Sequence, residues 1–311
     1  MPTKFKLNTG AEIPAIGFGT WQDAGSQENA VAEAIRAGYR HIDTAQAYGT
    51  EEPIGKAIRS SGIPRNELFV TTKLWNNAHH PDDVPKSLQG SLDRLGLDYV
   101  DLLLIHWPVA WKRGEEPFPK DSSGKPILEN VDWLDTYKAM EKLVSTGKVK
   151  AIGVSNFSKA EIERLIQNAT IQPAVHQFEG HPWLQQRTFA DWHKSKGIHV
   201  THYSPFGNQN ELYSRAGHLG KLIDEPILGE IGKKHGKNSA QTALAWAITD
   251  GHSVLPKSKT PSRIKTNFEG DFRLDEDDME KIHQIDRKLR FNDSSGEFGR
   301  DFFQDLEGTS V

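Results

Sequence analysis

Eight short, continuously apolar runs recur along the 311-residue chain, and each is followed by a polar or amphipathic stretch. Continuous rather than alternating apolar runs predict parallel strands that are buried on both faces. The stretches between them have helical spacing; in residues 26–38, Ser26 is a candidate N-cap and Gly38 a candidate stop. Repeated strand–helix units predict a (β/α)8 TIM barrel, an α/β fold. The runs are residues 15–19, 39–43, 68–73, 100–106, 150–155, 174–179, 198–204 and 252–258.

The remaining segments predict how the barrel is completed. Residues 4–17 hold a strand, a Thr-Gly turn and a second short run, which predict an N-terminal β-hairpin cap at the bottom of the barrel. Long loops, residues 107–133 and 204–228, follow the fourth and seventh strands on the face where barrel active sites lie. No linker interrupts the pattern, so residues 1–311 are expected to form a single domain. A C-terminal loop is expected to pack over the active-site face through Phe298, Phe302 and Phe303.

Composition excludes several classes of protein. The chain is 36% hydrophobic and 26% charged with a net charge of −4, so it lacks the basic footprint of a nucleic-acid binder. It has no cysteine, which excludes disulfides and thiolate chemistry and suits a reducing compartment. The start has no apolar signal segment, and Asp101 and His106 interrupt the longest apolar stretch. We therefore expect a cytoplasmic protein without a membrane or nucleic-acid partner.

Four titratable side chains lie at successive strand ends. Asp43 ends the second run, Lys73 the third and His106 the fourth, and Tyr48 follows Asp43 closely. Each alone has an ordinary structural explanation, as a turn former, a solvated lysine head or a structural histidine. Neighbouring strands of a barrel bring their carboxyl ends to one rim, so the four together favour a catalytic site.

These groups suit proton transfer to a developing alkoxide. A tyrosine with a pKa near 10 is a poor acid at neutral pH, and an adjacent ammonium from Lys73 is expected to lower that pKa. Asp43 would keep Lys73 charged, and a neutral His106 would orient a substrate carbonyl. Tyr48 would then donate the proton, so the set could reduce a carbonyl if a hydride donor is bound.

A nicotinamide cofactor would have to bind without a dinucleotide fingerprint, because residues 17–22 lack the third glycine. Barrels often bind phosphate after strands seven and eight, where residues 255–269 are basic. A solvated basic turn is the alternative reading of that segment. Tyr203 could be a platform for the nicotinamide ring or ordinary core. Hydroxyl and amide groups that suit a carboxamide stand at Ser155, Asn156 and Gln177.

Eight short motifs resemble those of the aldo-keto reductase superfamily in order and spacing, across nearly the whole chain. They are GFGTW, HIDTAQAYG, TTKLW, DLLLIHWP, IGVSNF, QFEGHPWL, YSPFG and LPKSKTPSRI. The resemblance implies a barrel that uses NADPH, less often NADH, without a Rossmann domain. The long loop after strand four is similar to those of fungal aldehyde or xylose reductase-like and glycerol dehydrogenase-like members.

The resemblance also implies a role for particular residues. The catalytic residues would be Asp43, Tyr48, Lys73 and His106, with Tyr48 as general acid. The nicotinamide amide would contact Ser155, Asn156 and Gln177, and the nicotinamide ring would stack on Tyr203. The basic segment would bind the 2'-phosphate, and Asn267 would contact the adenine. The full cofactor-binding set would be Thr20, Trp21, Asp43, Ser155, Asn156, Gln177, Tyr203, Ser204, Phe206, Asn208, Lys257, Ser258, Lys259, Thr260, Arg263 and Asn267. The substrate pocket would be lined by Trp21, Tyr48, Trp75, His106, Trp107, Trp111 and Phe118.

Three positions depart from the family pattern. Gln22 stands where many members carry a lysine that pairs with an aspartate, so we expect a neutral belt over the cofactor, from Gln22 to Asn208 or Asn210. Thr266 stands where an acidic residue often precedes Asn267, which affects the adenine contact. Lys259 adds a charge that favours NADPH if it points inward, and otherwise it points to water.

The expected function is NADPH-dependent reduction of aldehydes or short sugars, such as glyceraldehyde and aldoses, to alcohols, reversible toward polyol oxidation. The alternative is an NADPH-binding regulatory subunit with little turnover. A metal hydrolase is a third reading, but residues 176–181 do not form the H-E-x-x-H motif, so we expect no metal site. The expected partner is a small carbonyl or polyol substrate, and the expected state a monomer or weak homodimer.

Overall fold

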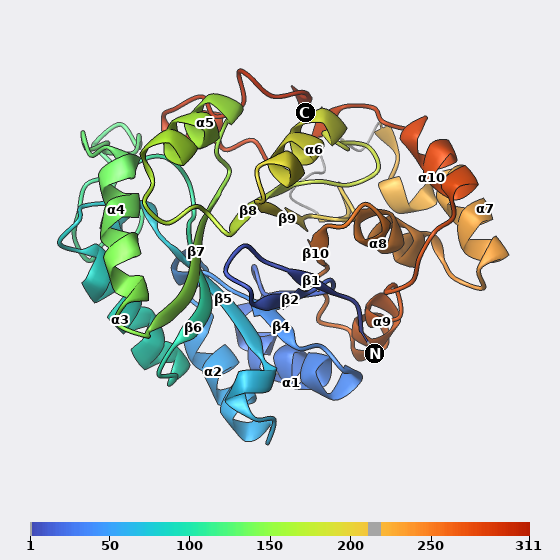
Figure 1. Cartoon of the computed structure of the whole chain (residues 1–311), viewed down its shortest axis with the longest axis horizontal. Coiled ribbons are helices and arrows are strands. Elements are labelled where there is room, and N and C mark those ends of the chain that lie inside the picture. Colours follow the sequence, from blue (N-terminus) through green and yellow to red (C-terminus); the bar gives the residue numbers. More distant parts are fainter. Residues whose placement is uncertain (1, 211–218) are drawn as a thin grey trace.

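Eight parallel strands form a barrel in a computed structural model that describes residues 2–210 and 219–311 (Figure 1). They are β3 (Phe18–Gly19), β4 (His41–Asp43), β5 (Phe69–Leu74), β6 (Val100–Ile105), β7 (Val149–Ser155), β8 (Val175–Glu179), β9 (His199–Tyr203) and β10 (Ser253–Leu255). Each pairs with its neighbours in chain order. A parallel bridge between Ile16 and Val254 and a 3.0 Å hydrogen bond from Gly19 N to Pro256 O close the sheet between β3 and β10. The predicted (β/α)8 architecture is confirmed.

Helices surround this barrel, as Figure 1 shows, and bury their apolar faces against the outer side of the strands. The expected ends of the first helix are confirmed: it is preceded by Ser26 and stops at Gly38, which has φ 113°. The Ser26 hydroxyl makes no capping bond and donates instead to Asp23 O at 3.0 Å. The helices are α1 (Gln27–Ala37), α2 (Glu51–Ser60), α3 (Val84–Leu95), α4 (Trp133–Val144), α5 (Lys159–Asn168), α6 (Arg187–Ser195), α7 (Pro226–Lys234), α8 (Ser239–Thr249), α9 (Pro261–Phe268), α10 (Glu276–His283) and α11 (Ser295–Phe298).

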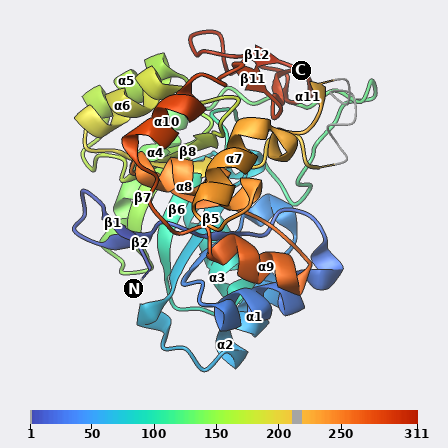
Figure 2. The ribbon, with the colours of Figure 1, turned by 90° about the vertical axis from the view of Figure 1, so that its right-hand side faces the viewer.

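An antiparallel hairpin of β1 (Lys4–Lys6) and β2 (Glu12–Pro14) covers the amino-terminal end of the barrel. Leu7 and Ile13 are buried there against Phe69 and Val175, which lie at the starts of their strands. Figure 2 shows the hairpin at one end of the barrel, with α11 at the opposite end. The predicted hairpin cap is therefore confirmed, and it leaves the carboxyl ends of the strands as the face on which a site can form.

The long loops and the C-terminal segment gather at those carboxyl ends. Residues 106–132 connect β6 to α4, and the connection after β9 runs to α7, with residues 211–218 outside the described part. In the tail, β11 (Leu289–Arg290) pairs in parallel with β12 (Thr309–Ser310). Asp305 fastens the tail to the start of α5 by accepting from Ala160 N at 2.8 Å. Within the described residues, every helix is too short or too polar to cross a membrane.

Several buried histidines are held neutral mainly by their burial. Phe157 N donates to His176 Nε2 at 3.1 Å, so Nδ1 of His176 carries its proton and donates to His193 Nε2 at 2.8 Å. His193 Nδ1 in turn donates to Phe189 O at 2.7 Å. Burial lowers the pKa of His193 and of His41 to about 4, and that of His202 to about 3. The folded chain therefore resists protonation at these rings.

We predict that the free energy of unfolding falls as the pH drops from about 6.5 to about 4. The unfolded chain takes up protons at histidine pKa values near 6.5, whereas the folded rings do not, so each such ring contributes a slope of up to about 1.4 kcal/mol per pH unit. Burial raises the pKa of Asp101, Glu161 and Asp250, which opposes the effect and reduces the net slope.

Urea unfolding at pH 7, 6 and 5 measures this slope. His41→Gln should reduce the slope by the contribution of about one proton, up to about 1.4 kcal/mol per pH unit. His80→Gln, at a partly exposed loop position, should leave it unchanged. An unfolding free energy that stays constant between pH 7 and 5 would contradict the prediction.

Candidate active site

The four titratable side chains predicted from the strand ends lie together. Lys73, in β5, reaches Asp43 at the end of β4, with Nζ 2.5 Å from Oδ1, and it also donates to Thr44 O at 3.0 Å. Lys73 Nζ lies 5.2 Å from the centre of the Tyr48 ring. The rings of Tyr48 and His106 have centroids 5.6 Å apart. Tyr48 is carried there by a 3₁₀ turn, Gln46–Tyr48, directly after β4.

Lys73 and Asp43 form a buried ion pair in which the charged form of Lys73 is favoured. The two side chains are only 1% and 4% exposed. Burial alone would lower the pKa of Lys73, but the Asp43 carboxylate and Tyr48 together outweigh burial, and the pKa is raised. The second carboxylate oxygen of Asp43 accepts from Gln177 Nε2 at 2.8 Å, and Thr20 Oγ1 donates to Asp43 O at 2.8 Å. The predicted effect of Asp43 on Lys73 is confirmed.

The pKa shift of Tyr48 differs from the prediction, whereas that of His106 agrees with it. Burial raises the pKa of Tyr48 above its usual value, and the nearby Lys73 only partly offsets this. The predicted lowering effect of Lys73 on the pKa of Tyr48 is present, but burial, with a smaller contribution from Asp43, raises that pKa by more than Lys73 lowers it, so the net shift is upward. Burial, together with Lys73, holds the pKa of His106 well below its usual range. The expected neutral imidazole is confirmed.

An aromatic wall lies beside these groups, as predicted. Trp75, Trp107 and Trp111 are buried, and Phe298 from the tail contacts all three at centroid distances of 5.8, 5.2 and 4.9 Å. Phe302 and Phe303 also contact Trp107, so the predicted packing of the tail is confirmed.

The other predicted pocket residues lie at the edge of this wall. Phe118 is 43% exposed and contacts Trp75 and Trp111. Trp21 is 39% exposed and makes no ring contact with another described aromatic residue. Several buried polar atoms of the described residues have no hydrogen-bond partner, and Trp111 Nε1 and His106 Nδ1 are those that belong to the wall and the four titratable groups. A bound polar molecule could satisfy groups of this kind.

The predicted amide and hydroxyl groups at the ends of β7, β8 and β9 join the same network. Asn156 has φ 61°, a left-handed conformation that asparagine tolerates. Its Nδ2 donates to His106 O and to Ser155 Oγ, each at 3.1 Å, and its Oδ1 accepts from Tyr203 OH at 2.7 Å. Because Gln177 binds Asp43, the residues expected to hold a nicotinamide lie against the four titratable groups.

The predicted neutral belt forms through one of its two candidate partners. Asn210 Nδ2 donates to Gln22 Oε1 at 2.7 Å. Asn208 does not take part: it donates to Gly220 O at 2.6 Å and accepts from Leu222 N, so its expected pairing with Gln22 is wrong. Of the neighbouring predicted residues, Ser204 has φ 50° and accepts from Asn292 Nδ2 at 3.1 Å, and Phe206 packs against the core.

The basic segment meets a carboxylate that sequence reasoning missed. Lys257 and Lys259 both form ion pairs with Asp23 on the loop after β3. Lys259 therefore points neither into the barrel nor simply to water. Its neighbour Thr260 donates N–H to Ser258 Oγ at 3.1 Å. Arg263 is exposed and Asn267 is buried on α9. The only signal for Asp23 was its place next to Gln22, which the predicted closure of the barrel brings beside β10.

A second missed residue anchors the tail. Glu179, at the end of β8, is buried and accepts from Phe291 N at 2.9 Å, from Asn292 N at 2.8 Å and from His181 Nε2 at 2.9 Å. The histidines of residues 176–181 are thus engaged with protein groups, since His176 lies in the chain of rings described above.

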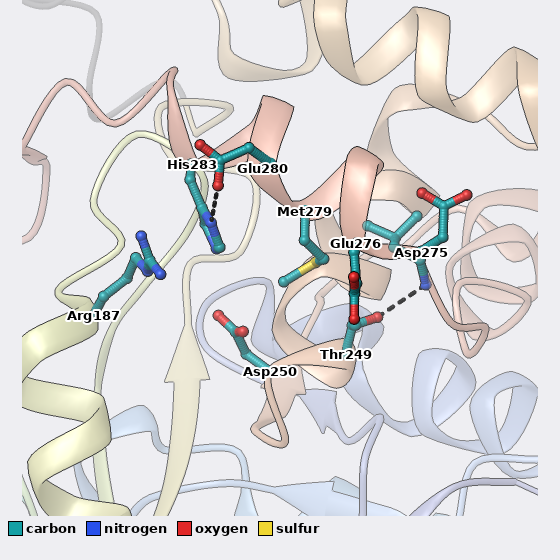
Figure 3. Close-up of a pocket in the computed structure, with 9 residues that line it drawn as sticks. Arg187, Thr249, Asp250, Asp275, Glu276, Met279, Glu280 and His283 are labelled. Atoms are coloured by element: carbon teal, nitrogen blue, oxygen red, sulfur yellow. Dashed lines mark hydrogen bonds and ion pairs between the residues drawn. The ribbon is translucent and has the colours of Figure 1, made fainter.

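A hollow of about 290 Å³ lies away from this site, between α6, α8 and α10. None of its lining residues was predicted for the site. Figure 3 shows two contacts among its lining residues: His283 pairs with Glu280 at 3.8 Å, and Thr249 Oγ1 accepts from Leu274 N at 3.0 Å. We place the candidate site at the strand ends, where the chemically matched groups converge.

Comparison with known proteins identifies the family of the chain. The model of the Aldo/keto reductase family matches residues 15–287, and the chain belongs to that family. An uncharacterized oxidoreductase of Schizosaccharomyces pombe is 48% identical over 94% of this chain and 91% of its own. Aldo-keto reductase family 1 member A1 of Xenopus tropicalis is 45% identical over 92% of this chain and 89% of its own. The structure of the aldose reductase from Schistosoma japonicum superposes with a TM-score of 0.89 at 37% identity, covering 96% of this chain and 97% of that one. The protein is an oxidoreductase of the aldo-keto reductase type.

We predict that Asp43→Asn lowers the free energy of unfolding by about 3–5 kcal/mol, because it leaves the buried Lys73 ammonium without its carboxylate. Lys73→Met in the same chain should recover much of the loss, since no unpaired charge then remains. Urea unfolding of the two single variants and the double variant measures the coupling. Additive losses in the double variant would contradict the prediction.

Proposed function

We propose that this chain is an NADPH-dependent reductase that converts aldehydes or short sugars, such as glyceraldehyde and aldoses, to alcohols, and that can run in reverse toward polyol oxidation. One observation carries the proposal: a buried, ionised Lys73–Asp43 pair lies against Tyr48 and a neutral His106. Proton donation to a reduced carbonyl needs this combination of a proton source, a stabilising cation and an uncharged orienting group.

Each of the four residues has a distinct role in the proposal. His106 donates a hydrogen bond to the substrate carbonyl and orients it. The raised pKa of Tyr48 keeps its hydroxyl protonated at neutral pH, so the proton is present when charge develops on the substrate oxygen. The Lys73 ammonium then stabilises the phenolate that remains, and Asp43 holds the ammonium in place. NADPH, held by the residues named below, would supply the hydride for the carbonyl carbon.

The cofactor assignment is supported by the donor set around these residues. Asn156, Gln177 and Ser155 offer amide and hydroxyl groups within the network that holds Asp43 and His106, and Tyr203 adds a ring beside them. The basic segment offers three cations at the start of α9, Lys257, Lys259 and Arg263, which suit the 2'-phosphate of NADPH better than the free ribose of NADH. Asn267 lies four residues further along α9, where it would meet the adenine.

The proposed substrate class follows from the aromatic wall. Its buried tryptophans and the tail phenylalanines carry no charge, so they suit a small neutral carbonyl compound rather than an acidic one. The unpartnered Trp111 Nε1 provides a donor for a hydroxyl or carbonyl oxygen. The name of the aldose reductase relative supports the same class.

We predict that the purified protein oxidises NADPH in the presence of glyceraldehyde and that Tyr48→Phe lowers kcat by about 10²-fold or more, as expected for loss of a general acid. Loss of reduced-nicotinamide absorbance measures both rates, with NADH run in parallel. Tyr99→Phe is the matched control, because Tyr99 stacks on Arg65 and Lys150 away from the site. Full activity in Tyr48→Phe would contradict the assigned acid. Tight NADPH binding without turnover would favour the regulatory-subunit alternative.

The neutral Gln22–Asn210 contact predicts that NADPH release is only weakly dependent on salt, because the described pair that spans the belt is a hydrogen bond between two uncharged amides. The double variant Gln22→Lys/Asn210→Asp would replace the amide pair with an ion pair and should make release accelerate as salt rises. Stopped-flow release of NADPH from 0.05 to about 0.5 M NaCl compares the two, a range over which screening changes strongly. A steep salt dependence of release in the unmodified protein would contradict the neutral belt.

A further inference from the structure

Asp23 places a carboxylate against the two lysines of the basic segment. Its Oδ1 lies 3.2 Å from Lys259 Nζ, and its Oδ2 forms an ion pair with Lys257 Nζ. Asp23 belongs to the β3–α1 loop, and the lysines belong to the β10–α9 loop. These loops adjoin because the barrel closes between β3 and β10. Each carboxylate oxygen thus pairs with one lysine, Lys257 or Lys259, of the segment proposed to bind the cofactor phosphate.

The backbone around Asp23 holds this carboxylate in position. Asp23 and Gln22 both adopt left-handed conformations, with φ 55° and 69°. Ser26 N and Oγ donate to Asp23 O at 2.8 and 3.0 Å, and Gln27 Nε2 donates to Gln22 O at 2.6 Å. The carboxylate is directed by the fold of its loop and does not depend on the lysines alone.

The ion pairs are accessible enough to exchange. The side chains of Asp23 and Lys257 are 30% and 28% exposed, and that of Lys259 is 64% exposed. Arg263, in the first turn of α9, is exposed and makes no ion pair with a described residue, so it stays available to an incoming phosphate. Hydrogen bonding to Lys257 lowers the pKa of Asp23, which keeps the carboxylate charged at neutral pH.

We propose that Asp23 is an internal counter-anion that competes with the 2'-phosphate of NADPH for Lys257 and Lys259. It is then a specificity-determining residue that limits the preference for NADPH over NADH. This inference rests on the proposed function, which assigns the phosphate to the basic segment. The physical reason is direct: the phosphate must displace the carboxylate or share the lysines with it, and two anions at hydrogen-bond distance from the same ammonium repel each other.

Asp23→Asn is the test variant, because asparagine keeps the volume and tolerates the left-handed backbone while removing the charge. Asp23→Gly removes the whole side chain at the same backbone conformation and guards against a residual hydrogen bond from asparagine. Glu28→Gln is the matched control, since it removes one negative charge from the first turn of α1, and Glu28 makes no ion pair with a described residue. Equilibrium dissociation constants for NADPH and NADH are measured by quenching of tryptophan fluorescence.

Both Asp23 variants should bind NADPH more tightly by roughly three- to tenfold, the size expected for loss of a partly exposed competing ion pair. NADH binding should be unchanged, and Glu28→Gln should alter neither constant appreciably. NADPH affinity should also fall more steeply with salt in the Asp23 variants. In the unmodified protein one ion pair replaces another on binding, whereas in the variants a new ion pair forms.

Three outcomes would overturn the inference alone: weaker or unchanged NADPH binding in the Asp23 variants, equal tightening of NADPH and NADH, or the same gain in Glu28→Gln. The first would make Asp23 a positioning residue for the lysines or a bystander. Binding of neither nucleotide by any of the chains would contradict this inference and the proposed function together. Tight NADPH binding without turnover of glyceraldehyde would count against the proposed function only, and the measured affinities would still decide the role of Asp23.

Discussion

The buried ion pair between Lys73 and Asp43 is the interaction on which the rest of the site depends. Removing two charges from water carries a penalty of several kcal/mol for each ion, which only close pairing and complete hydrogen bonding can offset. Adjacent strands β4 and β5 place the two groups 2.5 Å apart, and the remaining oxygen of Asp43 is used by Gln177 from the far side of the barrel. The same ammonium acts on both rings, since it favours the phenolate of Tyr48 and disfavours the protonated form of His106.

A closed barrel makes such a network possible because it brings side chains from non-adjacent parts of the chain to one rim. Gln177 binds Asp43 across 134 positions of sequence, and Asn156 links His106 to Tyr203. The tail completes the rim from one side through Phe298 and is itself held by Glu179. The groups of the proposed cofactor and substrate sites therefore share one hydrogen-bonded and aromatic framework, so a change in one is expected to reach the other.

Sequence reasoning found the fold and the central residues because both follow from local pattern plus one geometric rule. Continuous apolar runs marked the strands, and parallel strands in a barrel necessarily align their carboxyl ends, which brought Asp43, Lys73 and His106 together. The limits appear where the outcome depends on packing. The first run, residues 15–19, yields only Phe18–Gly19 as a strand, because its earlier residues close the barrel through single contacts. The raised pKa of Tyr48 reflects the loss of hydration in the folded chain, which the spacing of residues in the sequence does not predict.

The pairing of charged and polar side chains that lie far apart in the sequence was the second feature that the sequence did not predict. The pairing of Asp23 with Lys257 joins positions 234 residues apart, and the place of Asp23 next to Gln22 is the one local signal that could have indicated it. From the sequence, Asn208 was as good a hydrogen-bond partner for Gln22 as Asn210. In the structure it instead bonds to Gly220 O and Leu222 N, which belong to the same connection after β9.

The central claim is that this rim transfers hydride from a nicotinamide to a carbonyl carbon with Tyr48 as proton donor. The most direct measurement follows the hydride itself: glyceraldehyde is incubated with the protein and NADPH deuterated at C4, and the glycerol formed is examined by mass spectrometry. The account predicts one deuterium per glycerol, on the former carbonyl carbon, from one of the two C4 epimers of the cofactor. Glycerol without deuterium from either epimer, or no glycerol at all, would contradict it.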